Sequence, residues 1–199
     1  MIPAVNFLGN IKFPKMIKVK HNFDKVATEN IECNIKTELV NICKVIKINR
    51  GSKIAIAVGS RGIAELPRIV KEVVFYLKEL GANPFIVPAM GSHGGATSIG
   101  QRKVLEEYGI SEDAMSVPIK SSMEVVKIGT ISYNIPVFFD KIAFQADGII
   151  PINRIKKHTD FNGATESGLM KMLVIGLGKR IGAENIHRAG PPNFPQNIP

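Results

Sequence analysis

Histidines set among glycines and polar residues are the side chains of this sequence that point most directly to chemistry. His93 lies in the segment MGSHGGAT (residues 90–97), directly after an apolar run, and His158 and His187 follow in other polar or glycine-containing segments. Glycines let a backbone turn sharply and approach a ligand, and histidine exchanges a proton near neutral pH. A single loop histidine is usually an ordinary surface residue, but three in such segments favour a site.

The spacing of these histidines gives only a weak indication of a metal site. They are separated by 65 and 29 positions, and none has the i, i+4 helical spacing of a zinc-binding helix. A zinc hydrolase that uses His93, His158 and His187 therefore stays open as one alternative.

Lys171 is embedded in the apolar stretch GLMKMLVI (residues 168–175). Such a lysine either extends along a helix edge to reach water, or is desolvated and then loses its proton more easily and becomes a nucleophile. The residues alone favour the first interpretation, and the second remains possible.

Two glycine-containing segments raise the question of phosphate binding. Residues 176–180 (GLGKR) resemble a P-loop superficially, but no Ser or Thr follows the lysine, and no complete P-loop or dinucleotide fingerprint occurs. Residues 59–62 (GSRG) follow an apolar run and precede a predicted helix, so their backbone amides are candidates for holding a phosphate or a carboxylate. A non-catalytic module that binds a nucleotide or anion is the second alternative.

Three short apolar segments predict buried strands, and each is followed by a polar loop. They are residues 54–58, 84–89 and 148–152. Between the first two, apolar residues recur at helical spacing from Leu66 to Leu80, and Gly81 ends the pattern. Alternation of strand and helix predicts an α/β fold with a mostly parallel sheet flanked by helices, in which ligands bind at the carboxyl ends of the strands.

Further elements are expected between the second and third strands. Ser98 and Gln101 have the spacing of a capping box, so a helix is predicted from Ser98 to about Tyr108, with Gly109 as its end. Residues 125–131 and 135–139 predict two more strands, paired across residues 132–134.

The chain is interpreted as one main domain with two flanking segments. Residues 1–50 alternate short apolar and basic pieces and are expected to form a strand-rich N-terminal segment of the same domain. Residues 51–189 form the α/β cofactor-binding domain. Residues 190–199 (GPPNFPQNIP) are proline-rich and are expected to form neither helix nor central strand, and so to be a terminus or an interdomain linker.

Composition limits the classes of partner. With 45% hydrophobic residues, 199 residues are enough to bury a core, and no run is long or apolar enough to suggest a membrane span or a secretory leader, so the cytoplasm is the expected compartment. The net charge of +9 suits a small carboxylate or a nucleotide cofactor, whereas no nucleic-acid recognition motif occurs. The two cysteines, Cys33 and Cys43, are too few for a disulfide framework.

Several of these segments, taken together and in order, resemble a known family. They are SRGI at 60–63, GSHGGAT at 91–97, NRIKKHT at 153–159, ESGLMK at 166–171 and His187. Arg61 precedes His93 by 32 positions, and Lys171 precedes His187 by 16. In order and spacing the chain resembles the N-terminal half of the nickel-pincer lactate racemase family, from about residue 10 onward.

The resemblance implies a cofactor and a role for each motif. The cofactor is nickel held by a pyridinium-3,5-bisthiocarboxylic acid mononucleotide, which is supplied by cofactor biosynthesis proteins and attached through a thioamide to a lysine. By resemblance, Lys171 is the attachment residue, His187 is the nickel ligand, His93 and His158 are the acid and base, and Arg61 holds the substrate carboxylate. Further cofactor contacts are expected at Ser60, Gly62, Gly94, Gly95, Ser167 and Gly168.

The implied reaction is racemisation or epimerisation of a 2-hydroxy acid such as lactate. The α-hydrogen is too weakly acidic for a histidine to remove as a proton, and the resemblance implies that it moves as a hydride while a histidine takes the hydroxyl proton. Inversion needs a second base on the opposite face, and an arginine can hold the carboxylate with two hydrogen bonds. The family has a second domain that supplies further substrate contacts, so this chain is expected to be the N-terminal domain of a two-domain protein, with its oligomeric state left open.

Overall fold

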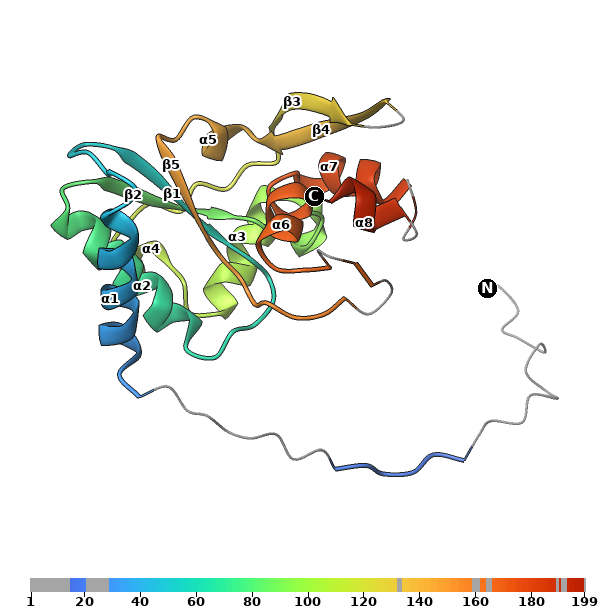
Figure 1. Cartoon of the computed structure of the whole chain (residues 1–199), viewed down its shortest axis with the longest axis horizontal. Helices are drawn as coiled ribbons and strands as arrows, with labels where there is room; N and C mark the ends of the chain where they lie inside the picture. The colour runs from blue at the N-terminus through green and yellow to red at the C-terminus, as the bar shows by residue number, and fades with distance from the viewer. Residues whose placement is uncertain are drawn as a thin grey trace.

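The chain folds around a parallel three-stranded sheet in the order β2-β1-β5. In the computed structural model, residues 15–20, 29–131, 134–158, 162–163, 166–188, 190 and 193–198 are described. Strand β1 (Lys53–Val58) lies in the centre and pairs in parallel with β2 (Asn83–Pro88) and with β5 (Gly148–Ile152). The parallel sheet, flanked by helices (Figure 1), confirms the α/β prediction and all three predicted strands to within a residue or two.

The sequence of β1, KIAIAV, places different side chains on the two faces of the sheet, because successive strand residues point to opposite sides. Ile54, Ile56 and Val58 belong to the larger core, which also contains Leu39 of α1 (Ile31–Cys43) and the apolar face of α2 (Leu66–Glu79). Ala55 and Ala57 lie on the other face with Met172 and Leu177 from the C-terminal part of the chain. The small alanines leave room for the backbone of that part to come close to the sheet.

Two predicted helices follow the first two strands. Helix α2 (Leu66–Glu79) starts with a proline in its first turn and is followed by Gly81 at φ +75°, a left-handed conformation that glycine adopts at little cost. Helix α3 (Ser98–Glu107) is followed by Gly109 at φ +78°, as expected. Its N-cap, however, is Thr97 and not Ser98: the Thr97 hydroxyl accepts a hydrogen bond from the Gly100 amide at 3.0 Å. The predicted first residue of the helix, Ser98, is thus confirmed, and the capping residue lies one position earlier than the capping-box spacing indicated.

The expectation of strands throughout residues 1–50 is wrong for its last part. Residues Ile31–Cys43 form helix α1, which packs against α2. Ile35, Leu39 and Cys43 are spaced four residues apart, so they share one helix face, and that face joins the larger core. The helical pattern is hard to detect because apolar residues also occur at exposed positions, Val40 and Ile42. Residues 1–14 and 21–28 lie outside the described part of the chain.

A hairpin and two short helices lie between α3 and β5. The antiparallel strands β3 (Val125–Ile131) and β4 (Ile135–Asp140) confirm the predicted pair, with an irregularity between Lys127 and Gly129. Helix α4 (Glu112–Met115) follows α3, α5 (Lys141–Phe144) follows β4, and a single parallel bridge joins Ile119 to Ile86 of β2.

The C-terminal part is helical and returns to the sheet. It comprises α6 (Leu169–Lys171), the π-helical segment η4 (Met172–Gly176), α7 (Lys179–Arg188) and α8 (Phe194–Asn197). A Cβ at Gly176 would lie 2.6 Å from the Ala89 carbonyl oxygen, so only glycine allows this approach. Helix α8 corrects the prediction that residues 190–199 contain no helix: Pro195 sits in its first turn, where its missing N–H is tolerated, and Phe194 and Ile198 are buried beside Ile186.

Among the described residues, no helix is both long and apolar enough to cross a membrane.

Candidate functional site

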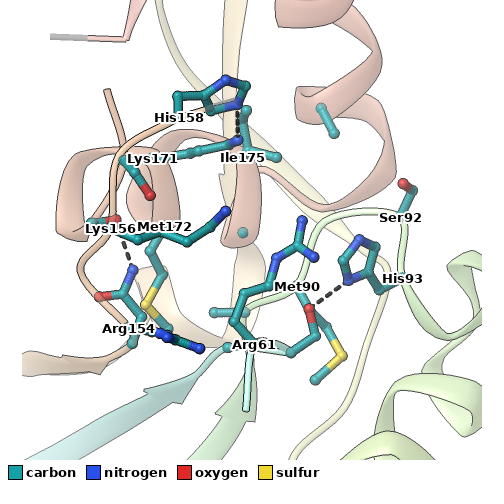
Figure 2. A pocket seen from close by; sticks show the side chains of 18 of the residues that line it. Arg61, Met90, Ser92, His93, Arg154, Lys156, His158, Lys171, Met172 and Ile175 are labelled. Carbon is teal, nitrogen blue, oxygen red and sulfur yellow. Dashed lines mark hydrogen bonds between the residues drawn. The ribbon is translucent and has the colours of Figure 1, made fainter. Parts of the chain in front are cut away.

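The predicted site residues meet in one cavity of about 440 Å³ at the carboxyl ends of the parallel strands. Loops after β1, β2 and β5 form its walls together with α6, η4, α7 and α8 (Figures 1 and 2). This edge is where parallel α/β sheets bind ligands, because loops from neighbouring strands converge there. The lining includes Ser60, Arg61, His93, Arg154, Lys156, His158, Ser167, Gly168, Lys171, His187 and Phe194.

Three glycines named as cofactor contacts do not line this cavity. Gly94 and Gly95 have φ +66° and +65°, so they serve the sharp turn after β2. At Gly94 a Cβ would also lie 2.6 Å from the backbone nitrogen of Gln101, which shows a packing requirement against α3. Gly62 has no atom within 4 Å of a Cβ position, and its φ is outside the left-handed region. The structure thus gives a backbone reason for two of the three glycines.

His93 is held by the loop that follows β1. Its Nδ1 is hydrogen bonded to the Ser60 hydroxyl at 2.5 Å, and the Ser60 carbonyl accepts a hydrogen bond from the Tyr108 hydroxyl at 2.6 Å. Partial burial, reinforced by the positive charges of Arg61 and Lys171, lowers the pKa of His93 below its usual 6.5. At neutral pH the ring is therefore uncharged and able to accept a proton.

His158 and Lys171 contact each other directly across the cavity wall, as Figure 2 shows. Lys171 Nζ lies 2.5 Å from His158 Nε2. The backbone amide of His158 donates to the Glu166 carboxylate at 3.0 Å, which holds the histidine in place. Asn153 Nδ2 donates to the Gly168 carbonyl at 2.8 Å and so fixes the residue from which α6 begins.

His187, on the last turn of α7, faces the same cavity from another side. Its ring lies 5.6 Å from that of Phe194, and the His158 ring contacts Phe194 edge-on with centroids 6.4 Å apart. Within the described residues, no group of three or more His, Cys, Asp or Glu side chains is arranged to hold a metal ion. The three cavity histidines thus do not form the zinc site of the hydrolase alternative.

Positive charge dominates the cavity. Arg61, Arg154, Lys156 and Lys171 line it, and the described lining residues include neither aspartate nor glutamate. Figure 2 shows these four cations coming from the loop after β1, the loop after β5 and α6. Such a cavity favours an anionic ligand, because each cation can pair with a carboxylate or phosphate oxygen.

A buried ion pair lies behind the His93 loop and was not foreseen from the sequence. Lys179 and Asp140 are both 0% exposed, and Lys179 Nζ lies 3.0 Å from Asp140 Oδ2. The ammonium also donates to the Pro88 carbonyl at 2.6 Å and to Gln101 Oε1 at 3.2 Å. Burial lowers the pKa of Lys179, and the Asp140 carboxylate opposes that shift.

Gln101 links this pair to the histidine loop. Its Nε2 donates to the Gly91 carbonyl at 2.8 Å and to the His93 carbonyl at 3.3 Å. The sequence alone indicates a capping-box position for Gln101, and it places Lys179 in an incomplete P-loop pattern. Two sequence features could have drawn attention to the pair: Lys179 lies between a glycine-rich segment and a helix, and Asp140 ends an apolar strand. Neither feature shows that the two side chains contact each other.

The parallel sheet and its cationic, histidine-lined cavity define an α/β protein with a site suited to an anionic ligand at the carboxyl edge of the sheet. Comparison with known families makes this more specific. The model of the lactate racemase N-terminal domain matches residues 8–192, and the chain belongs to this family. This membership confirms the resemblance seen in the sequence and indicates a lactate racemase-related role. No individually curated protein matches the chain well enough to serve as a relative.

Proposed function

We propose that the chain is the cofactor-bearing domain of a racemase or epimerase for a 2-hydroxy acid, with a nickel-pincer nucleotide tethered to Lys171. The observation that carries this proposal is the convergence of Lys171, His93, His158, His187 and Arg61 on one cavity. Membership in the lactate racemase N-terminal domain family supports it. The substrate is a small 2-hydroxy acid, and proteins that make the cofactor are the expected partners.

The cavity residues fit the proposed cofactor in three respects. The cavity has a volume of about 440 Å³, which lies in the range of small-molecule binding sites. A phosphate-bearing nucleotide suits a lining with four cations, and one metal-binding histidine, His187, suffices where the other metal ligands belong to the cofactor. The Lys171 amine reaches the same cavity, where it can be acylated. When bound, the nickel-pincer nucleotide supplies a reversible hydride acceptor.

The remaining chemistry belongs to side chains of this chain. Arg61 binds the substrate carboxylate and keeps the planar 2-oxo acid from leaving between the two half-reactions. His93 is uncharged at neutral pH, because its pKa is lowered, and takes or returns the hydroxyl proton on one face. His158 serves the opposite face.

The intact mass of the protein, produced together with a nickel-pincer biosynthetic system, tests this proposal. We expect an added mass equal to the nucleotide on the parent chain and on Lys141→Ala, and none on Lys171→Ala. Lys141 is a suitable control because it is an exposed lysine paired with Glu124 on the surface. A folded parent that stays unmodified while the cofactor is present in the cell would make the chain an anion-binding module.

Nickel content supplies a second measurement on the same samples. His187→Ala should keep the tethered nucleotide but hold less nickel per chain, because its imidazole is the proposed protein ligand. Zinc bound stoichiometrically to chains without the nucleotide would instead support the hydrolase.

A further inference from the structure

The contact between Lys171 and His158 has a chemical meaning beyond the two roles assigned above. A separation of 2.5 Å between Nζ and Nε2 requires a proton between the two nitrogens, shared or donated by one to the other. Hydrogen bonds hold the pair from both sides. The backbone amide of His158 donates to the Glu166 carboxylate, and the Asn153 side chain donates to the carbonyl of Gly168, which directly precedes α6. Lysine and histidine are thus set for proton transfer before any ligand arrives.

A lysine that is to be acylated has to lose a proton first, since an ammonium group has no lone pair. His158 Nε2 is a base within transfer distance of Nζ.

We propose that His158 is the base that activates Lys171 for its own covalent modification. The identity of the electrophile, a thiocarboxylate of the pincer nucleotide, rests on the proposed function. The activation of Lys171 by His158 does not depend on it.

The attachment step balances without a redox partner. The Lys171 nitrogen forms a bond to the thiocarboxylate carbon, and the carbon–oxygen bond breaks. Of the three ammonium hydrogens, one stays on the thioamide nitrogen, and two leave with the oxygen as water, the first of them by way of His158. Sulfur stays on carbon, and no atom is oxidised or reduced. Because a thioamide nitrogen is not basic, His158 is then released for the substrate hydroxyl.

Acetylation of the chain by p-nitrophenyl acetate tests the activation without the cofactor. Peptide mass spectrometry gives the rate at Lys171 relative to the exposed Lys127 in the same digest. We expect His158→Gln to slow acetylation of Lys171 by about 100-fold or more, the lower end of the range for general-base effects. Lys141→Gln changes an exposed side chain outside the cavity lining and leaves the Nζ–Nε2 contact, so it should keep the parental rate within about 2-fold.

The pH profile and chemical rescue separate a base from a merely structural residue. In the parent, the pH profile for acetylation of Lys171 should differ from that of Lys127 in the same digest, and in His158→Gln the two profiles should become alike, because the variant lacks the base. Added imidazole should restore the rate in His158→Ala. Equal rates and profiles in parent and both His158 variants, each folded by circular dichroism, would overturn the proposal.

Attachment of the cofactor provides a second test of the role of His158. With the biosynthetic system present, His158→Gln should carry less nucleotide by intact mass than the parent, while Lys157→Gln, an exposed neighbour outside the cavity lining, should match the parent. Full attachment in His158→Gln would contradict the proposal. An activated Lys171 in a parent that never acquires the nucleotide would instead refute the proposed function and leave the activation standing.

Discussion

His93 owes its chemistry to its neighbours more than to its own position in a glycine loop. The Ser60 hydroxyl orients the ring through Nδ1, and burial and two nearby cations favour the neutral form. A proton acceptor that is uncharged at neutral pH is useful for taking a hydroxyl proton. The sequence identified His93 as a candidate, but its protonation state follows only from what surrounds it.

Arg61→Met should raise the pKa of His93 toward 6.5. A nearby positive charge disfavours protonation of the ring, so removing that charge makes protonation easier, and the ring then becomes charged at a higher pH than in the parent. Titration of the His93 ring proton by NMR measures the shift. Arg61→Lys keeps the charge and should keep the parental pKa within error, and an unchanged value in Arg61→Met would contradict the electrostatic explanation.

Helix α7 and strand β4 brace the loop that carries His93. Lys179 begins α7 and Asp140 ends β4, and their ion pair reaches the end of β2 through Pro88. Lys179 has φ +54°, an unfavourable conformation for a residue with a Cβ, so the surrounding contacts have to hold it there. Gln101 of α3 then joins the same network to the Gly91 and His93 carbonyls.

Lys179→Met should lower the free energy of unfolding by about 3 to 5 kcal/mol, because it leaves the Asp140 carboxylate buried without its cation. Lys141→Met is the matched control. It breaks the ion pair between Lys141 and Glu124, whose two side chains are both exposed, and should lower the free energy of unfolding by only about 0 to 1 kcal/mol. Urea unfolding followed by circular dichroism measures both. Similar losses in the two variants would show that the buried pair contributes no more than a surface pair.

At the scale of the whole molecule, positive charge is concentrated where the loops of three strands meet. The net charge is +9, and four of the cations line one cavity. Charges gathered in a cleft with apolar walls raise the local concentration of anionic ligands. The charge distribution therefore favours the approach of an anionic ligand to this cavity.

Binding of oxalate to the chain should weaken as salt rises from about 20 mM to about 300 mM, because the shorter Debye length screens these cations. Isothermal titration calorimetry gives the affinity at each concentration. Arg61→Ala should reduce both the affinity and its salt dependence, whereas Lys127→Ala, on the exposed part of β3, should leave both unchanged. An affinity independent of salt would mean that charge contributes little to binding.

Local patterns determined much of this protein from the sequence alone. Short apolar runs specified the parallel strands, and glycines marked the ends of α2 and α3, because short buried strands and left-handed turns depend on a few adjacent residues. The polar loops after the strands named His93, His158 and Arg61 as candidates. Helix α1 and helix α8 were missed, since their helical form depends on the core that each packs against.

Only the tertiary structure decided which side chains meet. Lys179 and Gln101 are 78 positions apart, and the contact between Lys171 and His158 depends on how α6 is placed against the loop after β5. No local propensity encodes such pairs, because they form when separate elements pack and a buried charge has to find its partner. For this reason the sequence suggested the histidines and the lysine, whereas the charge of His93 and the base beside Lys171 emerged from the fold.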